Sequence, residues 1–179
     1  RATIGTNVPV SVDIVHRDVG RPDADPVASG EKLIAEAAAR FARGLVWRPG
    51  ARELVDAVRA AGIPSALVTN TERALTSLAL GPLLDELFDV SVCGDEVAHS
   101  KPAPDPYQKA AALLGVAPAA AVAIEDSPTG VASATAAGCP VLVVPGADVR
   151  VPPGPGRTFV DSLAGVTVAD LTALVARAA

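Results

Sequence analysis

The sequence predicts an α/β protein built around a doubly wound parallel sheet. From residue 51 onward, segments with the apolar spacing of helices alternate with short apolar segments of strand length. Three of these strands, VSV at 90–92, AVAI at 121–124 and VLVV at 141–144, are continuously apolar, which is typical of strands that helices cover on both faces. Repeated strand–helix units with such strands favour a parallel sheet between two helical layers.

Residues 1–46 differ from the rest because they carry helical patterns and no strand of the buried kind. Asn7 can cap a first helix that stops at Gly20, and Asp25 with Pro26 can open a second. The segment WRPG at 47–50 interrupts both periodicities and indicates a joint. We therefore expect two helices that form a cap or a bundle fragment, followed by the α/β part.

Beyond the joint, helices and strands are expected to alternate to the end of the chain. The segment VPPGPG at 151–156 is rich in proline and glycine and is expected to be a surface loop. The expected helices are 51–61, 72–80, 106–115, 128–137 and 167–177, and the expected strands are 64–69, 88–92, 120–125 and 140–144.

Composition narrows the class of protein. The 179 residues are half hydrophobic, enough for one main core and a small appended module. The net charge is −5 with acids and bases interspersed, so a nucleic-acid partner is not expected. No apolar stretch approaches the roughly 20 residues that span a bilayer, so no membrane partner is expected either. The two cysteines, Cys93 and Cys139, lie in or beside apolar segments and are interpreted as buried thiols of a cytoplasmic protein.

Three polar groups follow predicted strands, where ligands of open parallel sheets bind. The first is Thr69 with Asn70, which leads from strand 64–69 into helix 72–80 and could present a hydroxyl and free N–H groups to an anion. The alternative is that these residues only cap the helix. The second is Lys101, followed by the stiff sequence PAPDP at 102–106, which would hold its side chain in one direction. A solvated surface lysine is the alternative.

The third group is the acidic pair Glu125 and Asp126 at the end of the most apolar strand. Two adjacent carboxylates repel each other unless a cation lies between them, and an all-oxygen site suits Mg²⁺. Capping of helix 128–137 by Asp126 or Ser127 would explain one acid but leaves Glu125 without a reason. We therefore predict that Glu125 and Asp126 bind a metal ion.

Taken together, Thr69 after a strand, Lys101 in KPAPDPY and AIEDSPTG at 123–130 resemble, in order, the second to fourth motifs of the haloacid dehalogenase superfamily. The phosphoglycolate phosphatase and β-phosphoglucomutase-like branch is the most similar. The resemblance implies a Rossmann-like core at 47–179 with its first strand absent, and it identifies residues 1–46 as the C-terminal part of a small helical cap.

The resemblance also implies a Mg²⁺-dependent phosphatase that acts on a small phosphorylated metabolite through an aspartyl-phosphate. Thr69, Asn70 and Lys101 would bind the phosphoryl group, with Thr69 and Lys101 also acting in catalysis, and Glu125 and Asp126 would hold the metal.

The family's first motif, a strand followed by DxDxT or DxDGT, has no counterpart in this sequence. The nucleophilic and acid/base aspartates are therefore expected in a missing N-terminal segment, and the present residues alone are expected to be inactive. Without that central strand, its two neighbours would have exposed edges. A phosphomutase and a non-catalytic binding module remain alternatives, and a metal-independent dehalogenase is a weaker one. The substrate and the oligomeric state are left open.

Overall fold

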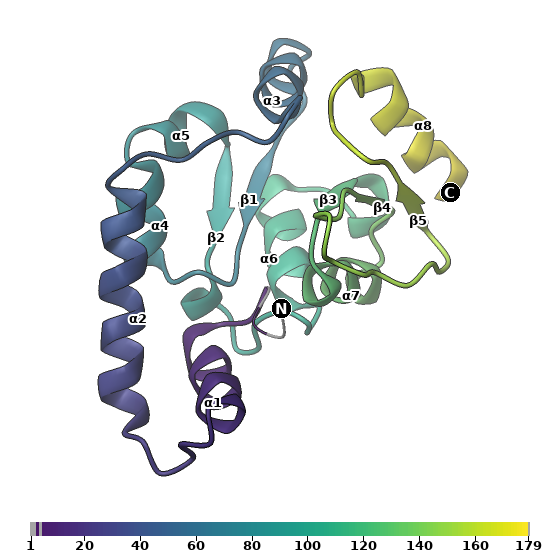
Figure 1. Cartoon of the computed structure of the whole chain (residues 1–179). Coiled ribbons are helices and arrows are strands. Elements are labelled where there is room, and N and C mark those ends of the chain that lie inside the picture. Colours follow the sequence, from purple (N-terminus) through teal and green to yellow (C-terminus); the bar gives the residue numbers. More distant parts are fainter. Residues whose placement is uncertain (1–2, 4, 179) are drawn as a thin grey trace.

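Helices and short parallel strands alternate along the chain in the computed structural model, which describes Thr3 and residues 5–178 (Figure 1). The predicted helices are present, with small changes in their bounds. The elements are α1 (Val8–Asp18), α2 (Pro26–Phe41), α3 (Ala51–Ala60), β1 (Ala66–Val68), α4 (Arg73–Leu80), α5 (Leu83–Leu87), β2 (Val90–Val92), the 3₁₀ turn η1 (Gly94–Glu96), α6 (Asp105–Leu114), the 3₁₀ turn η2 (Pro118–Ala120), β3 (Ala123–Glu125), α7 (Pro128–Ala137), β4 (Val141–Val143), β5 (Arg157–Phe159) and α8 (Val168–Ala178).

The strands form two parallel sheets. In one, β1 pairs with β2 in the register Ala66 to Val90; in the other, β3, β4 and β5 pair in that order. Within the described part of the chain, β1 and β3 each have one strand neighbour, so the edges that they turn toward the break are unpaired. The α/β class with parallel strands is confirmed, and the absent first strand stays a prediction.

Burial of the strands follows from this break. Only β4 is buried along its whole length, as its continuous apolar sequence predicts, whereas β1 is half-buried throughout. Ile124, in the middle of β3, is 40% exposed. A strand becomes buried on both faces only when neighbours and covering helices surround it, and β1 and β3 have such neighbours on one edge alone.

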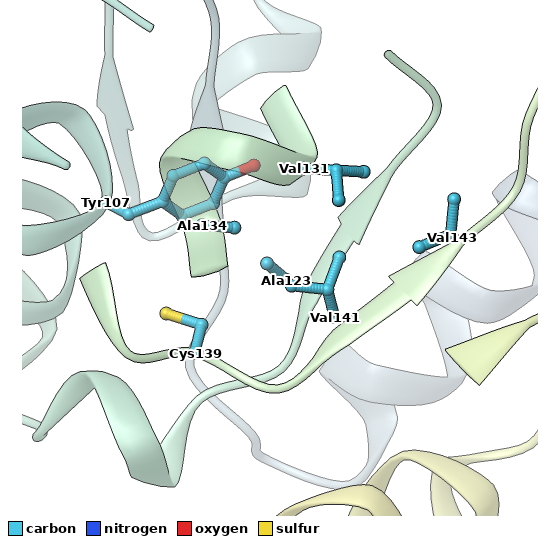
Figure 2. Packing of buried hydrophobic residues seen from close by; sticks show 7 residues of the cluster. All are labelled: Tyr107, Ala123, Val131, Ala134, Cys139, Val141 and Val143. Carbon is cyan, nitrogen blue, oxygen red and sulfur yellow. The ribbon is translucent and has the colours of Figure 1, made fainter. Parts of the chain in front are cut away.

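Helix α6 connects the two sheets. It packs against β1, β2 and α7, and Figure 1 shows it between the β1–β2 pair and the β3–β4–β5 sheet. A core cluster in the second sheet includes Tyr107 from α6, Val131 and Ala134 from α7, and Val141 from β4, and Val68 of β1 packs against it (Figure 2). The same apolar core therefore holds both sheets together.

The N-terminal helices lie beside α4, at one side of the first sheet. Helix α2 packs against α1 and against α4 (Figure 1), and a 2.8 Å hydrogen bond joins His16 Nε2 of α1 and Ser29 Oγ of α2. The predicted caps are present, since Asn7 accepts from the Val10 amide and Asp25 accepts from the Val27 amide. The division into a cap at 1–46 and a core at 47–179 stays a prediction.

Strand β5 extends the second sheet directly after the predicted loop at 151–156 and was not predicted. No helix in the described part of the chain has the length and apolar character needed to cross a membrane. Cys93 and Cys139 are both free thiols and both buried, as expected.

An ionic clamp holds the loop that follows β2. The Arg73 guanidinium donates to both carboxylate oxygens of Glu96 at 2.8 Å and also to Ser91 Oγ. Glu96 accepts a further bond from the Cys93 amide, and its carbonyl accepts one from Lys109. The hydrogen bonds from Arg73 lower the pKa of Glu96 to about 2 against the smaller, opposite effect of burial. The clamp thus ties α4, β2 and α6 around the loop that leads to Lys101.

We predict that Glu96→Gln makes the protein less sensitive to acid. A carboxyl group whose pKa is lower in the folded state stabilises that state above its unfolded pKa and loses the effect as the pH falls toward its folded pKa. For Glu96 this window runs from 4.5 down to about 2. Urea denaturation should therefore show a steeper loss of unfolding free energy across this window in the wild type than in E96Q. Equal losses in the two proteins would show that the ion pair of Glu96 does not contribute to the stability of the folded state.

Candidate functional site

The three polar groups selected from the sequence meet in one cleft at the carboxyl ends of β1 and β3. Its volume is about 400 Å³. It opens at the break between the two sheets, where the ends of the two strands and the start of α7 meet. The lining residues are Gly5, Thr6, Val68, Thr69, Asn70, Thr71, Lys101, Ile124, Glu125, Asp126 and Ser127.

Lys101 spans the break between the sheets. Its Nζ donates to Glu125 Oε1 at 2.5 Å, at the end of β3, and to the Val68 carbonyl at 2.9 Å, at the end of β1. The side chains of Lys101 and Glu125 are only 7% and 5% exposed. Lys101 is therefore not the solvated surface lysine of the alternative interpretation, but a buried cation paired with Glu125.

The Glu125 carboxylate has protein partners on both oxygens. Oε1 accepts from Lys101 and, at 2.5 Å, from the Tyr107 hydroxyl, while Oε2 accepts from Ser127 Oγ and the Asp126 amide at 3.3 Å. These donors explain why a buried carboxylate lies at position 125, which helix capping could not explain. In this geometry Glu125 holds the lysine in place, and its predicted role as a direct metal ligand stays a prediction.

Asp126 has the opposite environment. Its side chain is 57% exposed and forms a 3.1 Å ion pair with Arg48 from the joint, whose other amino group reaches the Pro145 carbonyl. An exposed ion pair of this kind contributes little, about 0 to 1 kcal/mol, so a competing cation can displace it. Of the two acids, Asp126 is the one with oxygen atoms available to a ligand.

The donor set fits Mg²⁺ bound together with a phosphate group. The described residues hold no group of three or more His, Cys, Asp or Glu side chains that could enclose a metal ion. Magnesium often binds through one or two carboxylates and completes its shell with water and substrate phosphate. An accessible Asp126 at the edge of the cleft is consistent with that mode of binding and not with a metal held by the protein alone.

Thr69 and Asn70 have mainly local partners. Thr69 Oγ1 accepts from the Thr71 amide at 3.0 Å, which shapes the turn that precedes α4. Asn70 is buried and holds the backbone of Lys101 from both sides, because Oδ1 accepts from its amide and Nδ2 donates to its carbonyl. Nδ2 also donates to the Gly5 carbonyl. Both amide hydrogens of Asn70 thus have acceptors in this geometry, so its side chain positions Lys101, and its predicted phosphate contact stays a prediction.

Several residues at the site were given no role by the sequence reasoning. Tyr107 lies in the first turn of α6 with its ring in the core, and burial, followed by the nearby Glu125 charge, raises its pKa well above the usual value (Figure 2). Its place in KPAPDPY, six residues after Lys101, was the available signal. Arg48 reaches Asp126 across 78 positions, a contact that no local pattern indicates.

Gly130 leaves the space that the Glu125 carboxylate occupies. A Cβ at Gly130 would lie 1.9 Å from Glu125 Oε2, whereas one at Gly30 in α2 would meet only a Val8 methyl at an ordinary 3.5 Å. Alanine at position 130 must therefore displace the carboxylate that holds Lys101. Both glycines lie inside helices, which makes Gly30 a matched control.

We predict that Gly130→Ala destabilises the protein by about 1 to 3 kcal/mol, as overpacking does in well-packed cores. Gly30→Ala should be neutral or stabilising by up to about 1 kcal/mol because alanine favours helices. The free energy of unfolding of each variant, measured in urea, checks this. If G130A is as stable as G30A, the stability of the folded protein does not depend on the present position of the Glu125 carboxylate.

Several known proteins are similar to this chain in sequence. Residues 16–138 match the family model of haloacid dehalogenase-like hydrolases. The chain is 45% identical to protein CbbY of Rhodobacter capsulatus over 101 residues, which cover 54% of this chain and 44% of that protein. It is 38% identical to protein CbbY of Cereibacter sphaeroides, with 88% and 73% covered, and 38% identical to hexitol phosphatase A of Escherichia coli K12, with 72% and 59% covered. The chain thus spans less than two thirds of two of these three relatives.

A solved structure leads to the same family. The crystal structure of CbbY from Rhodobacter sphaeroides in complex with phosphate superposes with a TM-score of 0.71 at 35% identity, covering 84% of this chain and 68% of that one. A point mutant of that protein in complex with xylulose-(1,5)bisphosphate superposes equally well, with a TM-score of 0.71, 35% identity, and 83% and 69% covered. Sequence and fold agree, and the chain belongs to the haloacid dehalogenase-like hydrolase family.

Proposed function

We propose that the protein is a magnesium-dependent phosphatase that hydrolyses a small phosphorylated metabolite through an aspartyl-phosphate intermediate. The observation that carries the proposal is the buried Lys101 ammonium, fixed between the two sheets beside an accessible carboxylate. The N-terminus of α7 lies at the same cleft through Ser127, and helix N-termini favour anions. A cation, a helix N-terminus and one accessible acid provide binding groups for a phosphate ester and a metal.

Each group has a distinct proposed role. Lys101 and Thr69 act on the phosphoryl group, with Lys101 neutralising the charge that develops as the ester bond breaks. Asp126 would hold Mg²⁺ in place of its ion pair with Arg48, and Glu125 contributes mainly by holding Lys101, as its hydrogen bonds support. When bound, Mg²⁺ polarises the phosphoryl oxygens and orients the phosphate. Asn70 positions Lys101 through its backbone.

The nucleophile is proposed to come from outside these residues. Among the described residues that line the cleft, the carboxylates are Glu125 and Asp126 alone, and both have the roles given above. We infer that an aspartate on a further strand, placed between β1 and β3, attacks phosphorus, and that a second aspartate protonates the leaving oxygen and then activates water. The unpaired edges of β1 and β3 support this placement.

The substrate class rests on the relatives. Hexitol phosphatase A acts, by its name, on hexitol phosphates, and the CbbY mutant was crystallised with xylulose-(1,5)bisphosphate. We propose a phosphorylated sugar or a similar small metabolite as substrate, and the buried free thiols support a reducing, cytoplasmic location. A phosphomutase would use the same groups but return a phosphate isomer instead of free phosphate.

We predict Mg²⁺-dependent release of inorganic phosphate from a generic phosphate ester by the full-length protein. Lys101→Met should lower kcat by about 10²- to 10³-fold, as does the loss of one preorganised group that stabilises developing charge. Lys32→Met, on the exposed face of α2, is the matched control and should leave kcat unchanged. Asp126→Asn should weaken Mg²⁺ binding measured by calorimetry.

Four results would contradict parts of this proposal. Full-length protein that carries the additional aspartates but releases no phosphate would reject a phosphatase, and Mg²⁺ binding without turnover would favour a binding module. Conversion of a sugar phosphate into its isomer would favour the mutase. Hydrolysis that a chelator leaves unchanged would reject the role of the metal.

A further inference from the structure

We propose that Tyr107 is a positioning residue that directs the Lys101 ammonium toward the phosphate. The expected effect on catalysis rests on the proposed function. The contacts of Tyr107 do not, because they involve only residues that the structure describes. The Tyr107 hydroxyl donates to the same Glu125 oxygen, Oε1, that accepts from Lys101 Nζ, and each distance is 2.5 Å. One carboxylate oxygen thus holds both the phenol and the ammonium.

The tyrosine also limits the position of the ammonium directly. Lys101 Nζ lies 4.9 Å from the centroid of the Tyr107 ring, within the range of a cation–π interaction. The hydroxyl oxygen lies 3.4 Å from Nζ. Because the phenol hydroxyl donates its hydrogen bond to Glu125, its oxygen can act toward Nζ only as an acceptor. Tyr107 therefore contacts the ammonium through its ring and its hydroxyl.

The three acceptors around Nζ differ in strength, and this difference indicates which contact the ammonium can give up to a ligand. The bonds to Glu125 at 2.5 Å and to the Val68 carbonyl at 2.9 Å are short, whereas the contact with the Tyr107 oxygen at 3.4 Å is long. An ammonium has three hydrogens to donate. The contact with Tyr107 is the weakest of the three, so it is the one that Nζ can exchange for a phosphate oxygen in the cleft, which Lys101 lines and Tyr107 does not, while the other two keep the ammonium in place.

Tyr107 can perform this task because it is itself fixed. Its ring is buried in the core cluster with Ala134 and Cys139, and Figure 2 shows it among those side chains. A lysine side chain has four rotatable bonds and is strongly hydrated, so it keeps one direction only when rigid neighbours impose it. The ring supplies a rigid wall, and the hydroxyl keeps Glu125 turned toward Lys101.

The test compares Tyr107→Phe with Ser133→Ala. Phenylalanine keeps the ring and removes the hydroxyl, while S133A removes another buried hydroxyl, which donates to the Ala103 carbonyl and does not contact Lys101. We expect Y107F to lower kcat by about 10- to 100-fold, the effect of a displacement of about 1 Å at a reacting group, with KM changed by less than about threefold. S133A should leave kcat unchanged even if it lowers stability.

A measurement without turnover separates this inference from the proposed function. A buried, hydrogen-bonded lysine ammonium exchanges its protons slowly enough to be observed by ¹⁵N-resolved NMR. We expect a Lys101 signal in the wild type and in S133A, and its loss or broadening in Y107F. Loss of the signal in Y107F supports the positioning role even if the wild type hydrolyses no ester. An unchanged signal in Y107F, or an equal fall of kcat in Y107F and S133A, would overturn it.

Discussion

The buried ion pair between Lys101 and Glu125 is the constraint on which the site depends. A charge removed from water is costly unless it is paired and hydrogen-bonded, and both members of this pair are almost fully enclosed. The pair also bridges the break between the sheets, since Lys101 reaches the Val68 carbonyl of β1 while Glu125 closes β3. The geometry of the cleft therefore follows from satisfying these two charges.

Neighbouring residues support the same pair. Asn70 holds the Lys101 backbone, Ser127 donates to Glu125 and also caps α7, and Gly130 leaves room for the carboxylate. The adjacent acids then have separate tasks, because Glu125 is the last residue of β3 and Asp126 already lies in the turn before α7. Glu125 turns inward to the lysine, and Asp126 turns outward to Arg48 and solvent. This division explains two adjacent carboxylates without requiring both to bind one cation.

Much of this arrangement could be predicted from the sequence because parallel sheets collect functional groups at one edge. The positions of Thr69, Lys101 and the acidic pair at strand ends were sufficient to predict that they meet, and they line one cleft. The roles of Asn70 and Tyr107 were not predictable, because they depend on side-chain rotation and on the distance between α6 and β3. The pairing of Arg48 with Asp126 and the addition of β5 to the sheet depend on tertiary contacts that have no local pattern. The break in the sheet was expected only through the family resemblance.

A double-mutant cycle on the buried pair tests the central claim most directly. Removing one member leaves the other charge buried and unpaired, so Lys101→Met and Glu125→Gln should each lower the free energy of unfolding by about 3 to 5 kcal/mol. The double variant should lose less than the sum of the two by at least about 1 kcal/mol, because it leaves no uncompensated charge. Additive losses would show that the two residues do not act as a pair and would contradict this account of the site.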